Sequence, residues 1–171
     1  NKPHMKKITL LAALFGSFIS ASYAQNKFGY INSRELLEVM PEVKKADSSL
    51  QIYAKSFQDQ LESMSKEYET KVKDFQANEK TMNEAVKEVK VKEVQQLQER
   101  MEALQQSAQE KTAKRREEMY KPILEKADKA IKDVAKENKY DYIFDASGGA
   151  ILYAKDSDNV LSLVKTKLGI K

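Results

Sequence analysis

The sequence predicts an α+β protein, mostly α, in which a long antiparallel helical hairpin projects as an arm from a small β-containing body. Three observations lead to this fold class. The chain runs from Glu42 to Lys121, 80 residues, without a single Pro or Gly. Apolar residues recur in this stretch at steps of three and four, which is the spacing of one helix face. Short segments rich in aromatic and β-branched residues lie on either side of it, toward both ends of the chain.

Residues 1–24 have the layout of a secretory signal peptide, with residues 1–4 as an upstream extension. The basic pair Lys6-Lys7 precedes an apolar core of about 12 residues, which is shorter than the ~20 needed to span a bilayer. Small residues in Ser22-Tyr23-Ala24 then favour cleavage before Gln25. An uncleaved membrane anchor is the alternative interpretation.

Removal of this segment almost cancels the net charge. The full sequence carries a net charge of +4, whereas the mature chain would carry 27 basic and 26 acidic residues. A nucleic-acid-binding protein is expected to show a clustered basic excess. We therefore predict that nucleic acid is not a partner.

The arm is predicted over residues 41–121, with its tip near residues 78–82. The apolar face of its first helix consists of Val43, Ala46, Leu50, Tyr53, Phe57, Leu61, Met64, Tyr68, Val72 and Phe75. This pattern then stops, and Thr81-Met82-Asn83-Glu84 has the form of a capping box that opens a second helix. The apolar side of that helix carries Val86, Val89, Val94, Leu97, Met101, Leu104 and Ala108. Two helices of about 37 residues would each extend ~55 Å.

Two prolines mark the predicted base of the arm. In an antiparallel hairpin with its tip near residue 80, Pro41 and Pro122 fall at nearly the same height. Proline suits the first turn of a helix and kinks a helix interior. We therefore expect the arm to begin at this level and to hinge there.

The body is predicted to combine residues 25–40 with residues 122–171. Short strands are expected at residues 27–31, at residues 140–145 and, after a Gly148-Gly149 turn, at residues 150–154. Helices are expected after the caps Asn32 and Ser33, through residues 123–138, and from a cap at residues 156–158 up to Gly169.

This body is small for independent stability. It would contain 66 residues, which bury only a marginal core, and its short strands would leave open edges. Self-association is the natural remedy, so the sequence favours an oligomer over a monomer. The predicted residues of the body core and of the subunit interface are Phe28, Tyr30, Ile31, Tyr142, Ile143, Phe144, Ile151, Leu152, Leu161 and Val164.

The composition argues against an enzyme. The chain has no Cys, and its only His is His4, in the predicted upstream extension. Thiol nucleophiles, Ser-His triads and His- or Cys-based metal sites are therefore excluded. The stretch Asp156-Ser157-Asp158-Asn159 lacks the Gly and Glu that complete a calcium-binding loop, so helix capping is the better interpretation. We predict no catalytic residue, no cofactor and no metal.

Motifs at the two ends of the chain carry a family resemblance. Near the start they are Phe28-Gly29-Tyr30-Ile31-Asn32, Leu36-Leu37 and Met40-Pro41-Glu42. Near the end they are Tyr140-Asp141-Tyr142-Ile143-Phe144-Asp145, Gly148-Gly149, Ile151-Leu152-Tyr153 and Asp156. Together with the signal peptide and the long helical stretch, they resemble the Skp/OmpH family of periplasmic chaperones over essentially all of residues 25–171.

The resemblance implies a homotrimer and a function. Strands from three subunits would build the body, and three helical hairpins would hang from it around a central cavity. The cavity would hold unfolded outer-membrane β-barrel proteins in the periplasm without using ATP, as a holdase. Contact with anionic membrane lipid would be weak, because the mature chain is nearly neutral.

Candidate client-contact residues come from the apolar faces of the arm. They are Phe57, Leu61, Met64, Tyr68, Phe75, Met82, Leu97, Met101 and Leu104. Packing between the two arm helices is the simpler role for most of them, with Met as a gap filler. The stretch from Gln105 to Glu118 has almost no large apolar side chain, so it either packs weakly or lines solvent in a cavity.

Within that stretch the densest basic run is a candidate anion contact, formed by Lys114, Arg115 and Arg116. Two acidic residues follow it directly, so a solvated helix face is the alternative interpretation. For the whole protein, the alternative function is a structural coiled-coil envelope protein that spaces or tethers its partners.

We predict that the mature protein begins near Gln25, because a basic start, a short apolar core and a small-residue site precede it. Mass spectrometry of the protein recovered from the periplasm should show this N-terminus. Recovery of membrane-embedded protein with Met5 intact would contradict the prediction.

Overall fold

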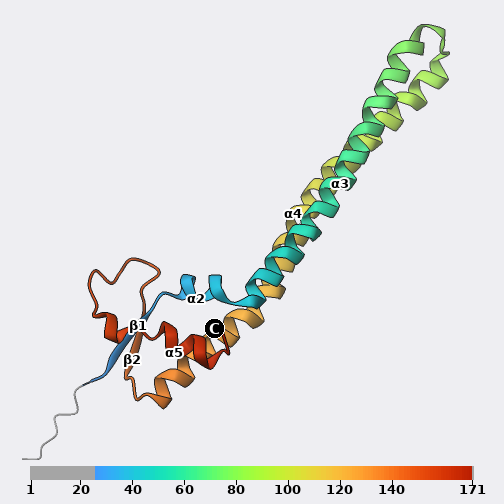
Figure 1. Cartoon of the computed structure of the whole chain (residues 1–171). Helices are drawn as coiled ribbons and strands as arrows, with labels where there is room; N and C mark the ends of the chain where they lie inside the picture. Colours follow the sequence, from blue (N-terminus) through green and yellow to red (C-terminus); the bar gives the residue numbers. More distant parts are fainter. Residues whose placement is uncertain (1–25, 171) are drawn as a thin grey trace, which may run out of the picture.

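The computed structural model describes residues 26–170, so the predicted signal peptide over residues 1–24 lies outside the described part of the chain. Figure 1 shows a long two-helix arm that leaves a small body at one end. The predicted fold class, mostly helical with a small β-containing body, is confirmed. None of the helices within residues 26–170 combines the length and the apolar character that a bilayer crossing needs.

Two helices, α3 (Pro41–Asn78) and α4 (Glu84–Glu137), form the arm. They run antiparallel along each other and are joined at the tip by the 3-10 turn η1 (Glu79–Thr81) (Figure 1). Both helices consist largely of good helix formers. The absence of Pro and Gly from residues 42–121 predicts such long helices. Helix α4 has 54 residues and continues from the tip of the arm into the body.

The second arm helix has a different N-cap from the predicted one. Asn83 is the cap, and its Oδ1 accepts a hydrogen bond of 2.9 Å from the Val86 N–H. The prediction that Thr81 caps this helix is wrong, because Thr81 lies in η1 and its hydroxyl donates to the Asn78 carbonyl at 2.8 Å. Asn and Thr both serve well as N-caps, so residue type alone does not decide between two candidates so close together.

The two prolines at the base of the arm play different parts. Pro41 is the first residue of α3, where its missing N–H costs no hydrogen bond. Pro122 lies inside α4, which continues through it as one helix. An ion pair between Glu42 and Lys126 across the arm shows that Pro122 lies about one turn away from the level of Pro41. The hinge expected at the two prolines stays a prediction.

The sheet of the body joins the two ends of the described chain. Strand β1 (Phe28–Ile31) pairs in parallel with strand β2 (Tyr142–Asp145), with Phe28 opposite Tyr142. On the other side of β1, Tyr30 forms an isolated parallel bridge with Asn159, and the Val160 N–H donates to the Tyr30 carbonyl at 2.9 Å.

The third strand, expected at residues 150–154, is absent from the described chain, so that prediction is wrong for a single subunit. The chain must cross from the end of β2 to the far side of β1, where Asn159 is bridged and Val160 is fully buried. This crossing carries residues 150–154 away from the free edge of β2. Leu152 and Tyr153 consequently stand 97% and 84% exposed.

The last helix closes the body. Helix α5 (Leu161–Lys167) follows the 3-10 turn η2 (Asp156–Asp158), and Gly169 ends it with φ of 71°, as predicted. The expected cap at residues 156–158 is wrong. The side chain that reaches the start of α5 is Asn159, whose Oδ1 accepts a hydrogen bond of 2.9 Å from the Leu161 N–H.

One apolar core holds the body together. Helix α2 (Ser33–Val39) packs against the body end of α3, and its Leu36 joins a core shared with α4 and α5. The residues that become almost fully buried there are Ile31, Leu36, Met40, Val134, Val160 and Val164.

The predicted body residues divide into two groups. Ile31 and Val164 belong to this core, and Ile143 and Leu161 pack against it. Tyr30 and Ile151 are half-buried, and the remaining four are exposed in a single chain, namely Phe28, Tyr142, Phe144 and Leu152. These four are not core residues of this chain, and their expected place in a subunit interface stays a prediction.

The contact line between α3 and α4, called the seam from here on, changes character along the arm. Near the tip, Lys71 pairs with Glu93 at 2.9 Å and Lys90 with Asp74 at 3.0 Å. At the base, the Tyr120 hydroxyl donates to Asp47, and Lys126 pairs with Glu42. These partners lower the pKa of Asp74, Glu93 and Glu42 and raise that of Tyr120 through direct hydrogen bonds.

The middle of the seam is held by apolar contacts. Within the described chain, no hydrogen bond or ion pair joins residues 48–70 of α3 to residues 94–119 of α4. Phe57 and Leu97 are buried there, with 9% and 2% exposed. Residues half-buried along the same line are Leu61, Met64, Tyr68, Met101 and Leu104.

Asp145, at the end of β2, connects the sheet to the start of α2. Its carboxylate accepts hydrogen bonds from the Ser33 N–H at 3.2 Å, the Ser33 hydroxyl at 2.6 Å and the Ser147 N–H at 2.9 Å. Partial burial raises the pKa of Asp145, but the hydrogen bonds from Ser33 and Ser147 outweigh it and hold the pKa at about 2. The sheet and α2 are thus joined by an ionised carboxylate.

Replacing Asp145 by Asn should lower the free energy of unfolding at pH 7 by about 1 kcal/mol, a value reduced for the exposure of the side chain. Because the folded-state pKa is depressed, the stabilisation is fully present above about pH 4 and is lost as the pH falls through about 2. Urea unfolding of parent and variant should therefore converge in acid. Asp156→Asn, on the exposed turn η2, is the matched control. If the difference in free energy of unfolding between parent and Asp145→Asn were as large in acid as at pH 7, the role of the ionised carboxylate would be refuted.

Phe57→Ala should loosen the middle of the seam. We expect a loss of about 2 kcal/mol, less than the ~3–5 typical of a core Phe, because a two-helix seam can partly collapse around the gap. Trypsin should then cut the arm faster, while cleavage of the body is unchanged. Ile52→Ala removes a side chain that is 72% exposed on the same helix, so it should be cut like the parent. If Phe57→Ala and Ile52→Ala are cut at equal rates, Phe57 does not hold the seam.

Candidate functional site

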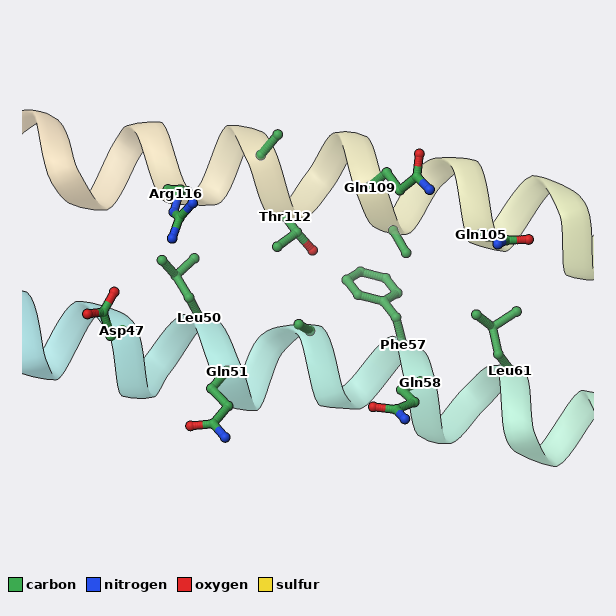
Figure 2. Close-up of a pocket in the computed structure, with 13 residues that line it drawn as sticks. Asp47, Leu50, Gln51, Phe57, Gln58, Leu61, Gln105, Gln109, Thr112 and Arg116 are labelled. Atoms are coloured by element: carbon green, nitrogen blue, oxygen red, sulfur yellow. The ribbon is translucent and has the colours of Figure 1, made fainter.

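An open groove runs along one flank of the seam in the middle of the arm. It has a volume of about 760 Å³ and is lined by Asp47, Leu50, Gln51, Ala54, Phe57, Gln58 and Leu61 of α3 and by Gln105, Ala108, Gln109, Thr112, Ala113 and Arg116 of α4. Figure 2 shows Leu50 and Phe57 pointing from α3 toward α4, and Thr112 pointing back.

The groove arises from an unequal pair of helix faces. Helix α3 supplies the large side chains Leu50, Phe57 and Leu61, whereas α4 lines the groove with the smaller Ala108, Thr112 and Ala113 among its residues. Small residues leave space that the large ones fill only in part. The lack of large apolar residues in Gln105–Glu118 left two alternatives open, weak packing or a solvent-lined cavity, and the groove corresponds to the weakly packed one.

The rim of the groove is neutral. Gln51 and Gln58 line it on α3, and Gln105 and Gln109 line it on α4. The two charged residues stand at its body end, where both are engaged with the same tyrosine. Asp47 accepts a hydrogen bond from the Tyr120 hydroxyl, and the Arg116 guanidinium lies 5.7 Å from the centre of the Tyr120 ring.

The opposite flank of the arm is basic at the same height. Lys111, Lys114 and Arg115 gather there beside Tyr53, and Arg115 approaches Glu118 at 3.7 Å. The predicted anion cluster of Lys114, Arg115 and Arg116 is therefore wrong as one site, because Arg116 faces the groove on the other flank. Successive residues on a helix point about 100° apart, so a run of three cannot share one narrow flank.

The predicted client-contact residues are distributed along the arm. Phe57 and Leu61 line the groove, and Phe75 borders two smaller hollows toward the tip. Leu97 is buried in the seam, and the half-buried members are Met64, Tyr68, Met82, Met101 and Leu104. Sequence reasoning missed the glutamine rim, because a single Gln on a polar helix carries no signal that sets it apart.

An exposed aromatic cluster forms a second candidate surface, on the body. Phe28 stacks on Tyr142 with ring centres 5.8 Å apart, and Tyr142 stacks on Phe144 at 6.1 Å. The three side chains remain 48%, 58% and 49% exposed. A hollow of about 610 Å³ beside them is lined by Phe28, Phe144, Ile151 and Tyr153 among others. An exposed apolar patch of this kind is typical of a protein interface.

Both surfaces are suited to binding. The groove offers apolar side chains, amides and two charges that are already engaged, and its lining residues include no His or Cys. Within residues 26–170, no three His, Cys, Asp or Glu side chains come together in a way that could hold a metal ion.

Comparisons with known proteins agree with this architecture. A crystal structure of a Caulobacter crescentus CB15 protein described as OmpH-like superposes with a TM-score of 0.76 and 14% identity, covering 85% of each chain. The curated relatives include the "Chaperone protein Skp" of Photorhabdus luminescens and that of Photorhabdus laumondii. Each is 27% identical over 163 residues, which span 94% of this chain and 97% of the relative.

A family model described as "Outer membrane protein (OmpH-like)" matches residues 27–168. The prediction that this chain is not an enzyme is confirmed by that family, since both curated relatives are named as chaperones. The match covers nearly all of the described residues, and the chain therefore belongs to the OmpH-like family.

Proposed function

We propose that this protein is an ATP-independent periplasmic holdase that binds unfolded outer-membrane β-barrel proteins between the helical arms of a homotrimer and prevents their aggregation. The relatives named as Skp chaperones support the chaperone role. The observation that carries the binding role is the arm itself, which projects from the body and leaves its apolar seam open along one flank.

The proposed mechanism is enclosure by many weak contacts. Half-buried apolar residues recur along the outer half of the arm, from Leu61 near its middle to Phe75 and Met82 near its tip. A client chain that touches several arms in this way cannot pair its strands with those of another client. Release is passive, because each weak contact detaches quickly and no covalent step holds the client.

The trimer is supported by the body surface. The exposed aromatic cluster of Phe28, Tyr142 and Phe144 and the almost fully exposed Leu152 and Tyr153 lie on and beside a sheet of only two strands. Residues 150–154, which find no strand partner within the described chain, are available to extend the sheet of a neighbouring subunit. Such pairing would cover both the sheet edge and the aromatic side chains.

The compartment is proposed from the sequence of residues 1–24, which has the layout of a signal peptide. Export across the inner membrane would deliver the chain to the place where outer-membrane proteins pass in an unfolded form. The near-neutral mature chain and the division of its basic residues between two flanks of the arm favour clients held by apolar contact over capture of anionic lipid.

The direct test is suppression of aggregation. A urea-unfolded porin diluted into buffer should stay soluble when the protein is present at one to a few trimers per porin, without nucleotide, as followed by light scattering. A structural spacer would leave the porin to aggregate. That outcome would replace the holdase by the spacer function.

Shortening the arm should lower the largest client that can be protected. Removing 14 residues from each helix next to the tip takes away ~21 Å of reach and preserves the phase of the seam, because 14 residues make nearly four turns. Protection of a small porin should outlast that of a large one in the light-scattering assay. Equal loss of protection for both clients would point to one localised binding site. Full protection of both would point to the body as the binding surface.

Trimer formation should depend on the body. Joining residue 41 to residue 122 through a short linker removes the arm, and sedimentation should still show a trimer. Phe144→Asp places a charge in the exposed aromatic cluster and should give a folded monomer, whereas Leu163→Asp, at a comparably exposed apolar residue on α5, should stay trimeric. A folded monomer after removal of the arm would contradict assembly through the body.

A further inference from the structure

We propose that the glutamine-rimmed groove in the middle of the arm binds one extended, uncharged stretch of client chain in which apolar and polar side chains alternate. This inference rests on the proposed function and specifies which part of an unfolded outer-membrane protein the arm prefers. The groove is one contact among many along the arm, and it is the one in which the client backbone is also recognised.

The dimensions of the groove suit an extended segment. Its floor runs from Leu50 to Leu61 on α3, about 16 Å at 1.5 Å per residue. An extended chain covers that distance in about five residues at ~3.3 Å each. The volume of about 760 Å³ lies within the ~300–1,000 Å³ that is usual for ligand-binding pockets.

The floor offers places for alternate side chains. Ala54 lies along α3 between the large residues Leu50 and Phe57, and Ala108 and Ala113 border the groove from α4. These small residues leave room above them, and alternate side chains of an extended segment point to the same side. Apolar side chains inserted there would cover the exposed flank of the seam and be removed from water themselves.

The rim offers partners for a client backbone of any sequence. Gln51 and Gln58 on one side and Gln105 and Gln109 on the other each carry an amide that can both donate and accept hydrogen bonds. Gln105 and Gln109 lie one turn apart, about 6 Å along α4, close to the ~6.7 Å over which the backbone groups of a strand repeat. An extended segment leaves these backbone groups free to pair, whereas a helix uses them internally.

The distribution of charge favours an uncharged segment. Asp47 and Arg116 close the body end of the groove and are both engaged with Tyr120. The basic side chains at this height, Lys111, Lys114 and Arg115, lie on the opposite flank. An acidic segment would be attracted to that flank, and a neutral alternating segment meets neutral amides in the groove.

The arm is also able to widen at this level. Polar contacts across the seam lie at the tip and at the base, so the middle can separate slightly without breaking an ion pair. Widening would let larger apolar side chains enter between Phe57 and Thr112.

The test uses the full trimer and two fluorescein-labelled peptides of eight residues. One alternates Leu and Thr, and the other contains the same residues as a block of Leu followed by a block of Thr. Fluorescence anisotropy should show about tenfold tighter binding of the alternating peptide, which corresponds to about 1.4 kcal/mol.

Filling the groove should abolish this preference. The double variant Ala54→Leu/Ala113→Leu places larger side chains at two exposed groove positions, and Leu is nearly as good a helix former as Ala. It should bind both peptides equally weakly while its circular dichroism and sedimentation match those of the parent. Ala103→Leu, at an exposed position of α4 outside the groove, is the matched control and should keep the tenfold preference.

Equal binding of both peptides by the parent, or an undiminished preference in the filled variant, would overturn the inference. So would tighter binding of an amphipathic helical peptide than of the alternating peptide in the parent. The porin aggregation assay tests the proposed function separately. If the parent protects the porin but shows no peptide preference, only the proposed role of the groove is rejected. If the parent prefers the alternating peptide but does not protect the porin, the proposed holdase function is rejected.

Discussion

The arm exists because two distant parts of the chain must meet to make one sheet and one core. Phe28 pairs with Tyr142 in a parallel ladder, and Leu36 from before the arm packs in the same core as Val134, at the body end of α4, and Val164, which follows that helix. Parallel strands require a long crossover connection. Here that connection leaves the body as α3 and returns as α4, so the arm is an elongated crossover whose two halves stabilise each other.

The seam that holds this crossover together is not uniform. Its polar contacts and its groove lie in different parts of the arm. Ion pairs such as Lys71–Glu93 and Glu42–Lys126 fix the tip and the base. Between them no hydrogen bond or ion pair crosses the seam within the described chain, and in the groove large side chains on α3 face small ones on α4. The part of the seam without polar contacts therefore also contains the open groove.

The sequence predicted those features that depend on local pattern. The spacing from Val43 to Phe75 indicated α3, and the polar stretch after Leu104 indicated either weak packing or a solvent-lined surface. It did not predict which of Thr81 and Asn83 caps α4, since both residue types serve. It also placed a strand at residues 150–154, because β-propensity does not reveal that the chain must first cross β1 to bury Val160. The flank on which each of Lys114, Arg115 and Arg116 lies depends on the register of two helices, which a single sequence pattern does not fix.

Hydrogen exchange of the full protein, with and without an unfolded porin, tests most directly whether the arm holds the client. We expect amides around residues 48–61 and 105–116 to exchange quickly in the free protein and to become protected when the porin is bound. Amides of the body core around Leu36 and Val164 should exchange slowly in both states. Protection confined to the body, or no protection of the arm while the porin remains soluble, would contradict client binding by the arm.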